Sequence, residues 1–145
     1  MTTVGTSSAP PPLRASDVAR PEAVPMLRGA VARYLAGAGL TGKLVAVVKL
    51  AVSEAVTNAV IHAYRDNDSE GDLSVRAGVE SGELVVVVAD RGVGLAPRRD
   101  SPGLGLGMPL MASVTSRFRV VSRGAGTEVH MAFPLPSDGS GNARG

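Results

Sequence analysis

The sequence predicts a domain of the α+β class, with two helices ahead of the strands. Apolar residues recur at helical spacing in the first half of the central region, and short runs with strand-like alternation or dense valine fill the second half. At 145 residues, the chain is long enough to bury a normal hydrophobic core. We therefore expect one domain with tails rather than several domains.

The two ends of the chain differ in composition from this central region. Residues 1–15 are rich in Thr, Ser and Pro, and residues 137–145 are rich in Gly and Ser. Such segments cannot bury enough apolar surface to offset the entropy that they lose on ordering. We therefore expect a disordered tail at residues 1–15, a folded domain at residues 16–136 and a second disordered tail at residues 137–145.

Two helices are predicted, over residues 22–36 and about 43–64. The first is amphipathic, because its apolar residues recur every three or four positions: Val24, Leu27, Val31 and Leu35. Gly37 and Gly39 end this helix, and Thr41 can cap the one that follows. The second helix contains no Gly or Pro and is long, so we expect it to lie at the centre of the fold.

Three polar side chains share one face of the second helix. Glu54, Asn58 and His62 lie four residues apart, and at about 3.6 residues per turn they stack above one another. A carboxylate, an amide and an imidazole in this arrangement form either a binding face or a solvated polar stripe. The helix alone does not decide between these two interpretations.

Four strands are predicted after the second helix, over residues 73–79, 83–89, 118–122 and 128–133. Ser81-Gly82 forms a turn between the first two strands, so a hairpin is their natural pairing. The second strand contains a run of four valines, which indicates burial on both faces and a position inside the sheet.

The valine-rich strand ends in Asp90-Arg91-Gly92-Val93-Gly94. This sequence places a carboxylate acceptor beside backbone without side-chain bulk, where a flat ligand with an exocyclic amine can approach closely. An ordinary turn closed by the Asp side chain has the same sequence pattern, so this segment alone leaves both interpretations open.

A second glycine-rich segment spans residues 101–108. Its alternating glycines are followed by a methionine: Gly103, Gly105, Gly107 and Met108. The segment leads into a short predicted helix at residues 109–114, whose free N–H groups and dipole favour phosphate. The spacing is that of neither a Walker loop nor a dinucleotide-binding fingerprint, and a flexible linker is the alternative.

Composition argues against several classes of partner. The formal net charge is only +2, no run of Lys or Arg forms a basic stripe, and two Phe and two Tyr offer little base stacking, so we expect no direct nucleic-acid binding. The absence of Cys excludes disulfides and thiolate metal sites. No export signal and no apolar run of about 18 residues is evident, so we expect a cytoplasmic protein without membrane contact.

Four segments of the sequence share a resemblance: Glu54-x-x-x-Asn58-x-x-x-His62, Asp90-x-Gly92-x-Gly94, Gly103-x-Gly105-x-Gly107 and Gly126-Thr127. In order and spacing they resemble the ATP-binding motifs of the GHKL superfamily, which includes gyrase B, the MutL repair proteins, heat-shock chaperones and sensor histidine kinases. Residues 52–64 look most like the bacterial anti-sigma-factor serine kinases, and the resemblance covers about residues 20–135. It implies a Bergerat-type ATP-binding fold, a two-layer α/β sandwich whose mixed, mostly antiparallel sheet is covered by helices on one face.

The resemblance also implies ATP and Mg²⁺ as cofactors, with roles for the second helix. Asn58 would coordinate Mg²⁺ through its side-chain oxygen, while the triphosphate supplies most of the other ligands. Glu54 would be the catalytic residue, acting as the base for an attacking hydroxyl. His62 would lie at the helix end without contacting the nucleotide directly.

Further along the chain, the resemblance assigns the remaining contacts to the nucleotide. Asp90 would accept a hydrogen bond from the adenine amino group, with Gly92 and Gly94 leaving room for the base and Thr127 close by. The lid over the phosphates would be formed by Gly103, Gly105 and Gly107, and Met108 directly after them would also contact the nucleotide. A cation near the lid is also expected, and three arginines are candidates: Arg91, Arg98 and Arg99.

The function implied by this resemblance is that of an anti-sigma factor with ATP-dependent serine/threonine protein kinase activity. Such a protein binds a sigma factor and phosphorylates an anti-anti-sigma protein of the STAS-domain type in a partner switch, commonly as a homodimer. The alternative is a nucleotide-binding docking module without phosphotransfer, although the intact Glu54 favours activity. One departure from the family pattern concerns residues 14–22, which are short and Pro-rich where the family usually opens with a clear strand.

Overall fold

The computed structural model describes residues 11–66, 71–90, 111–123 and 126–136. Its elements follow along the chain as β1 (Leu13–Val18), α1 (Ala23–Gly37), α2 (Lys43–Asp66), β2 (Asp72–Glu80), β3 (Glu83–Asp90), β4 (Arg117–Arg123) and β5 (Gly126–Pro134). A further helical turn spans residues 111–114. The predicted α+β class is therefore confirmed.

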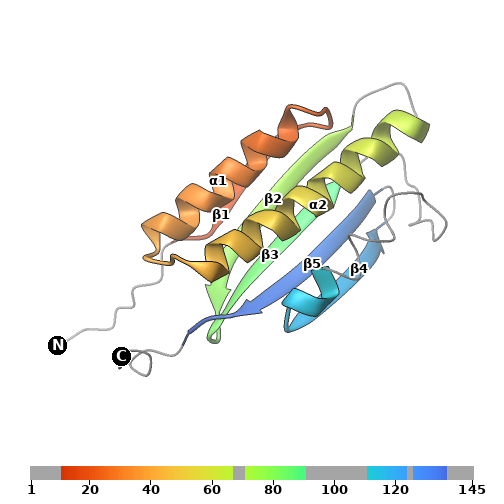
Figure 1. Ribbon diagram of the computed structural model, residues 1–145. Helices are drawn as coiled ribbons and strands as arrows, with labels where there is room; N and C mark the ends of the chain where they lie inside the picture. The colour runs from red at the N-terminus through yellow and green to blue at the C-terminus, as the bar shows by residue number, and fades with distance from the viewer. Residues whose placement is uncertain (1–10, 67–70, 91–110, 124–125, 137–145) are drawn as a thin grey trace.

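The five strands form one sheet in the order β1-β2-β3-β5-β4, and α1 and α2 lie side by side on one face of it (Figure 1). This two-layer arrangement agrees with the predicted sandwich. The sheet was expected to be mixed, but each of the four neighbouring pairs among the described strands is antiparallel. The reason is that β5 lies between β3 and β4, so these two strands, which run in the same direction, never become neighbours.

The predicted tail at residues 1–15 is wrong at its C-terminal end. Leu13–Val18 forms β1, which pairs with β2 from Leu13↔Ala77 to Val18↔Asp72. Leu13 and Ala15 pack against the core on the side of the helices. Small and polar side chains after a proline triplet give this strand a weak sequence pattern, which explains the error. Residues 1–10 and 137–145 lie outside the described residues.

The core lies between the helices and the sheet. The face of α1 that was predicted to be apolar is buried, with Val24 only partly so, and α2 adds a second buried face. Fully buried side chains of large volume come from both layers: Leu27, Val31, Leu35, Val48, Val52, Val56, Leu73, Val75, Leu84, Met111, Met131 and Phe133.

The α2 segment Lys43–Ile61 has a mean hydropathy of 1.8 and is long and apolar enough, by length and composition, to cross a membrane. The prediction that no apolar run approaches the length needed to span a membrane is therefore corrected. In the fold, this helix packs against the sheet, and its residues that face the sheet belong to the hydrophobic core. A central helix of a two-layer sandwich needs such a composition to bury its inner face.

The β2–β3 hairpin fixes the position of the strand end that carries Asp90. Ser81 and Gly82 have φ values of 48° and 79°, as the two-residue turn of a tight hairpin requires. Glu80 therefore pairs with Glu83, and the same register carries through to Leu73↔Asp90 at the far end. The predicted hairpin and its turn are confirmed.

Candidate functional site

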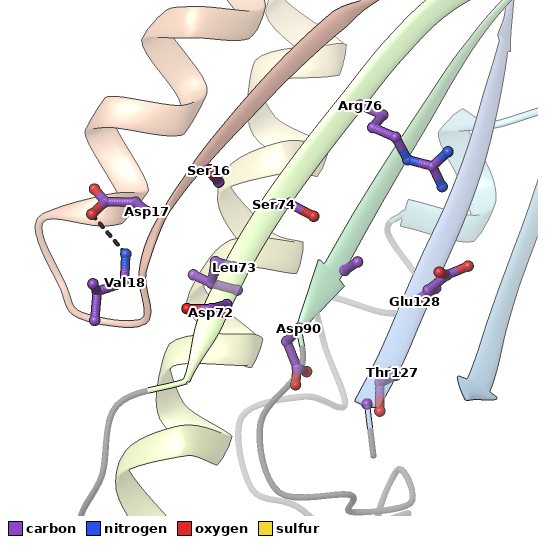
Figure 2. Close-up of a pocket in the computed structure, with 12 residues that line it drawn as sticks. Ser16, Asp17, Val18, Asp72, Leu73, Ser74, Arg76, Asp90, Thr127 and Glu128 are labelled. Atoms are coloured by element: carbon purple, nitrogen blue, oxygen red, sulfur yellow. Dashed lines mark hydrogen bonds between the residues drawn. The ribbon is translucent and has the colours of Figure 1, made fainter. Parts of the chain in front are cut away.

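The described part of the predicted nucleotide site begins where β3 ends. Asp90 lies directly opposite Thr127 of β5 and Leu73 of β2 (Figure 2). Leu73 is fully buried in the core on the side of the helices. Because directly opposed residues point to the same side of a sheet, Asp90 and Thr127 face the helical layer as well. The structure thus brings together these two residues, which are far apart in the sequence.

The environment of Asp90 shapes its chemistry. Burial raises the pKa of Asp90 from its ordinary value of 3.8 to about 6, because a partly desolvated site disfavours the charged carboxylate. Near neutral pH the group is still mostly ionised, and an ionised carboxylate only accepts hydrogen bonds. A ligand with an amino group is therefore a suitable partner for this position.

On α2, the orientation of Glu54 and Asn58 follows from their neighbour Ser53, whose hydroxyl lies 3.4 Å from the guanidinium of Arg28 on α1. This contact turns Ser53 toward α1. Each residue advances about 100° around a helix, which places Glu54 and Asn58 on the flank of α2 away from α1. That flank lies over the β3 and β5 half of the sheet (Figure 1). Both side chains are partly buried, as expected for a binding face rather than a fully solvated stripe.

Most of the predicted glycine contacts cannot be placed in the same way. Six predicted site residues lie outside the described residues: Gly92, Gly94, Gly103, Gly105, Gly107 and Met108. The same holds for the three candidate cations Arg91, Arg98 and Arg99 and for the side chain of His62. The predicted lid over the phosphates therefore stays a prediction.

The helical turn at residues 111–114 shows where the chain rejoins the core after this segment. Met111 is buried, and its carbonyl accepts a hydrogen bond of 2.9 Å from the hydroxyl of Thr115. That hydroxyl also lies 3.3 Å from the carbonyl of Ala112, so it satisfies the end of the helical turn. The predicted helix at 109–114 is thus confirmed in its described part, and Met111 anchors it.

Two further residues share the row of Asp90 and were missed in the sequence. Ser122 of β4 lies opposite Thr127, and Asp17 of β1 lies opposite Leu73. One carboxylate oxygen of Asp17 accepts a hydrogen bond of 2.7 Å from the backbone of Val18, while the other is buried without a hydrogen-bond partner in the described chain. Neither residue belongs to a motif, so only the strand order could have identified them.

A cavity of about 990 Å³ adjoins the strand ends (Figure 2). Asp90 and Thr127 line one end of it, but Glu54 and Asn58 do not. Its other lining residues include Ser74, Arg76 and Glu128, which alternate with helix-facing residues along their strands. The cavity therefore extends past the strand ends onto the side of the sheet opposite the helices, and we do not equate it with the nucleotide site.

The residues around the end of β3 fit a nucleotide with a divalent cation. Asn58 and Glu54 offer oxygen atoms, the ligand type that Mg²⁺ prefers, and Asp90 and Thr127 offer hydrogen-bonding groups for a base. Among the described residues, no group of three His, Cys, Asp or Glu side chains could hold a metal alone. This donor set suits a cation that takes most of its ligands from phosphate.

Comparisons with known proteins identify the family of this domain. The sequence model of the family described as histidine kinase-like ATPase domain matches residues 18–133. The anti-sigma F factor of Pasteuria penetrans is 35% identical over 120 residues, which cover 74% of this chain and 80% of that protein. The serine-protein kinase RsbW of Bacillus subtilis is 43% identical over 74 residues, 51% of this chain and 46% of that protein. The chain thus spans about half the length of the RsbW relative.

Solved structures show the same fold. The structure of the RsbU and RsbW domains of Rv1364c from Mycobacterium tuberculosis aligns with a TM-score of 0.70 and 27% identity, covering 87% of this chain and 33% of that chain. The histidine kinase domain of the blue-light activated kinase from Erythrobacter litoralis EL346 aligns with a TM-score of 0.55 and 26% identity, covering 77% and 61%. With a family model that matches most of its length and a relative covered over 80% of its length, the chain belongs to the family of histidine kinase-like ATPase domains.

Proposed function

We propose that this domain binds Mg²⁺-ATP between α2 and the ends of β3 and β5. Membership in an ATPase-domain family implies ATP binding. The observation that carries the site is the cross-strand pair of Asp90 and Thr127, which faces the helical layer beneath the flank of α2 that holds Glu54 and Asn58. Asp90 accepts a hydrogen bond from the adenine amino group, and the hydroxyl of Thr127 lies beside it.

The same arrangement supports phosphoryl transfer to a hydroxyl group. Asn58 would hold Mg²⁺ through its side-chain oxygen, and the cation would supply neutralisation of the phosphate charge. Glu54, one turn before Asn58 on the same flank, takes the proton from a serine or threonine hydroxyl as that oxygen attacks the γ-phosphorus and ADP leaves. Gly92 and Gly94 leave room for the base, and Gly103, Gly105 and Gly107 complete the site as the lid predicted from the sequence, with Met108 directly after them.

In the cell, we propose that the protein is a cytoplasmic anti-sigma factor. It binds a sigma factor and phosphorylates an anti-anti-sigma protein of the STAS-domain type, with no direct contact to nucleic acid or membrane. Relatives named anti-sigma F factor and serine-protein kinase RsbW support this proposal. A homodimer is part of it, and the region of β1 and α1 suits an interface because β1 is an edge strand and Met26 of α1 is 52% exposed.

The test is incubation with γ-labelled ATP and an anti-anti-sigma protein encoded by the same genome. We expect label on a serine or threonine of the partner. Glu54→Gln should abolish this transfer and largely spare ATP binding, since the amide keeps the size of the side chain but cannot take a proton.

The two alternatives give different results in this assay. A docking module without phosphotransfer would bind ATP and leave the partner unlabelled with the wild-type protein. If Glu54→Gln loses ATP binding and transfer to the same extent, Glu54 has a structural role and the assignment of the base is wrong.

A further inference from the structure

The sheet has a second face, on the side away from α1 and α2, that no other described element covers (Figure 1). Along β2, Leu73, Val75 and Ala77 are buried toward the helices. The residues between them, Ser74 and Arg76, therefore point to the opposite side. We call this side the open face.

A row of cationic side chains crosses the open face. The register pairs Arg14 with Arg76, Arg76 with Val87, Val87 with His130 and His130 with Arg119. This single row therefore reaches all five strands. With neighbouring strands about 4.8 Å apart, the backbones of its two outermost arginines are separated by about 19 Å. Arg14, Arg76 and Arg119 are all exposed.

These three arginines have no acidic partner among the described residues. The ion pairs within the described chain join other groups: Arg20 with Asp17, Arg117 with Glu83, and His130 with Glu128. Charged groups are normally arranged to meet the opposite charge of a partner at an interface. A row of exposed guanidinium groups without a carboxylate partner in the described part of the chain thus favours an acidic partner.

Apolar surface and hollows accompany the cationic row. Val87 is only 6% exposed, because it lies between the side chains of Arg76 and His130. A cavity of about 560 Å³ on this face is lined by Val85, Arg119, His130 and Ala132, whereas carboxylates line much of the larger cavity beside Arg76. Figure 2 shows Arg76 and Glu128 on this side, with the helices behind the strands. The smaller cavity of the open face thus has an apolar floor beside the guanidinium group of Arg119.

We propose that the open face docks an acidic segment of a protein partner, in which carboxylates alternate with apolar side chains. The carboxylates pair with Arg76 and Arg119, which are exposed and three strands apart. The apolar side chains occupy the smaller cavity, beside Val85 and Ala132. A nucleic acid fits less well, because a phosphate chain carries no apolar groups that could fill the hollow beside Val85 and Ala132. This interaction is independent of the proposed ATP site.

The experiment measures fluorescence anisotropy of a fluorescein-labelled peptide of alternating Glu and Leu at low ionic strength, with a peptide in which Gln replaces Glu as the neutral probe. The test protein is the double variant Arg76→Glu with Arg119→Glu. The matched control is Arg33→Glu with Lys49→Glu, which changes the charge equally at two exposed positions of the helical layer. Arg76→Gln with Arg119→Gln provides a milder variant, and thermal melting confirms that each variant is folded.

We expect the acidic peptide to bind more tightly than the neutral one, and the open-face variant to weaken its binding about tenfold or more. The control should stay within about twofold of the wild type. Equal loss in the two double variants, or equal binding of the two peptides, would overturn the proposal. It would also be overturned if oligothymidine bound more tightly than the acidic peptide, or if light scattering showed that the open-face variant dissociates a dimer.

Discussion

The buried carboxyl of Asp90 leads to a prediction in which ATP affinity and stability respond to pH in opposite directions. The folded state holds the proton of Asp90 more tightly than the unfolded chain, because burial raises its pKa from 3.8 to about 6. The protein therefore becomes more stable as the pH falls through 6, and this gain in stability is complete below the pKa of Asp90 in the unfolded chain. Over the same pH range the carboxyl of Asp90 becomes protonated, and its protonated oxygen no longer accepts a hydrogen bond from the adenine amino group. The affinity for ATP therefore falls.

The size of the effect follows from these two pKa values. Proton linkage between about pH 7 and about pH 5 contributes about 1.3 kcal/mol to the free energy of unfolding. Asp90 is partly exposed, so solvent screens part of this, and we expect about 1 kcal/mol. Asp90→Asn removes the titrating group, and its stability should therefore lack this rise.

Urea unfolding at a series of pH values, for the wild type and for Asp90→Asn, measures the difference. Asp72→Asn is the control, because it removes the same charge at an exposed position of the neighbouring strand. We expect the wild type to gain about 1 kcal/mol relative to Asp90→Asn between about pH 7 and about pH 5, with no such gain relative to Asp72→Asn. Parallel pH profiles for the wild type and Asp90→Asn would refute the reasoning.

Two further predictions concern the metal and the hairpin. Asn58→Ala should lower the affinity for ATP about tenfold or more in the presence of Mg²⁺ but little in EDTA, as measured by titration calorimetry. The control variant Thr57→Ala, at the neighbouring position, should change neither affinity. If Asn58→Ala leaves the Mg²⁺ dependence of ATP binding unchanged, Asn58 is not a ligand of the metal. In the turn, both residues have a positive φ, of 48° at Ser81 and 79° at Gly82, which glycine adopts more easily than other residues. Ser81→Gly should therefore stabilise the protein by about 0.5 kcal/mol, and Gly82→Ala should destabilise it by about 1 kcal/mol. Urea unfolding measures both, and effects of the same sign would contradict the turn geometry.

The helices and the central hairpin could be predicted because their signals are local. Leu27 and Val31 repeat at helical spacing, and the run of valines before Asp90 lies within β3. The first strand could not be predicted in this way. Leu13–Val18 is short and rich in small or polar residues, and it is a strand because it pairs with β2 and packs beneath α1.

The candidate site depended on contacts between distant parts of the sequence. Nothing local indicates that β5 inserts between β3 and β4, yet this order alone places Thr127 beside Asp90. The motif resemblance predicted the pair, and the register shows it. The orientation of Glu54 likewise required the contact between Arg28 and Ser53, because helical periodicity gives the relative angle of two residues but not the direction of either.

The central claim is a Mg²⁺-ATP site between α2 and the ends of β3 and β5, and titration calorimetry of the wild-type protein with Mg²⁺-ATP tests it most directly. The account predicts saturable binding of one nucleotide per chain, weakened by Asp90→Asn more than by the exposed control Asp72→Asn. No binding by a protein that circular dichroism shows to be folded, or equal weakening by the two variants, would contradict it.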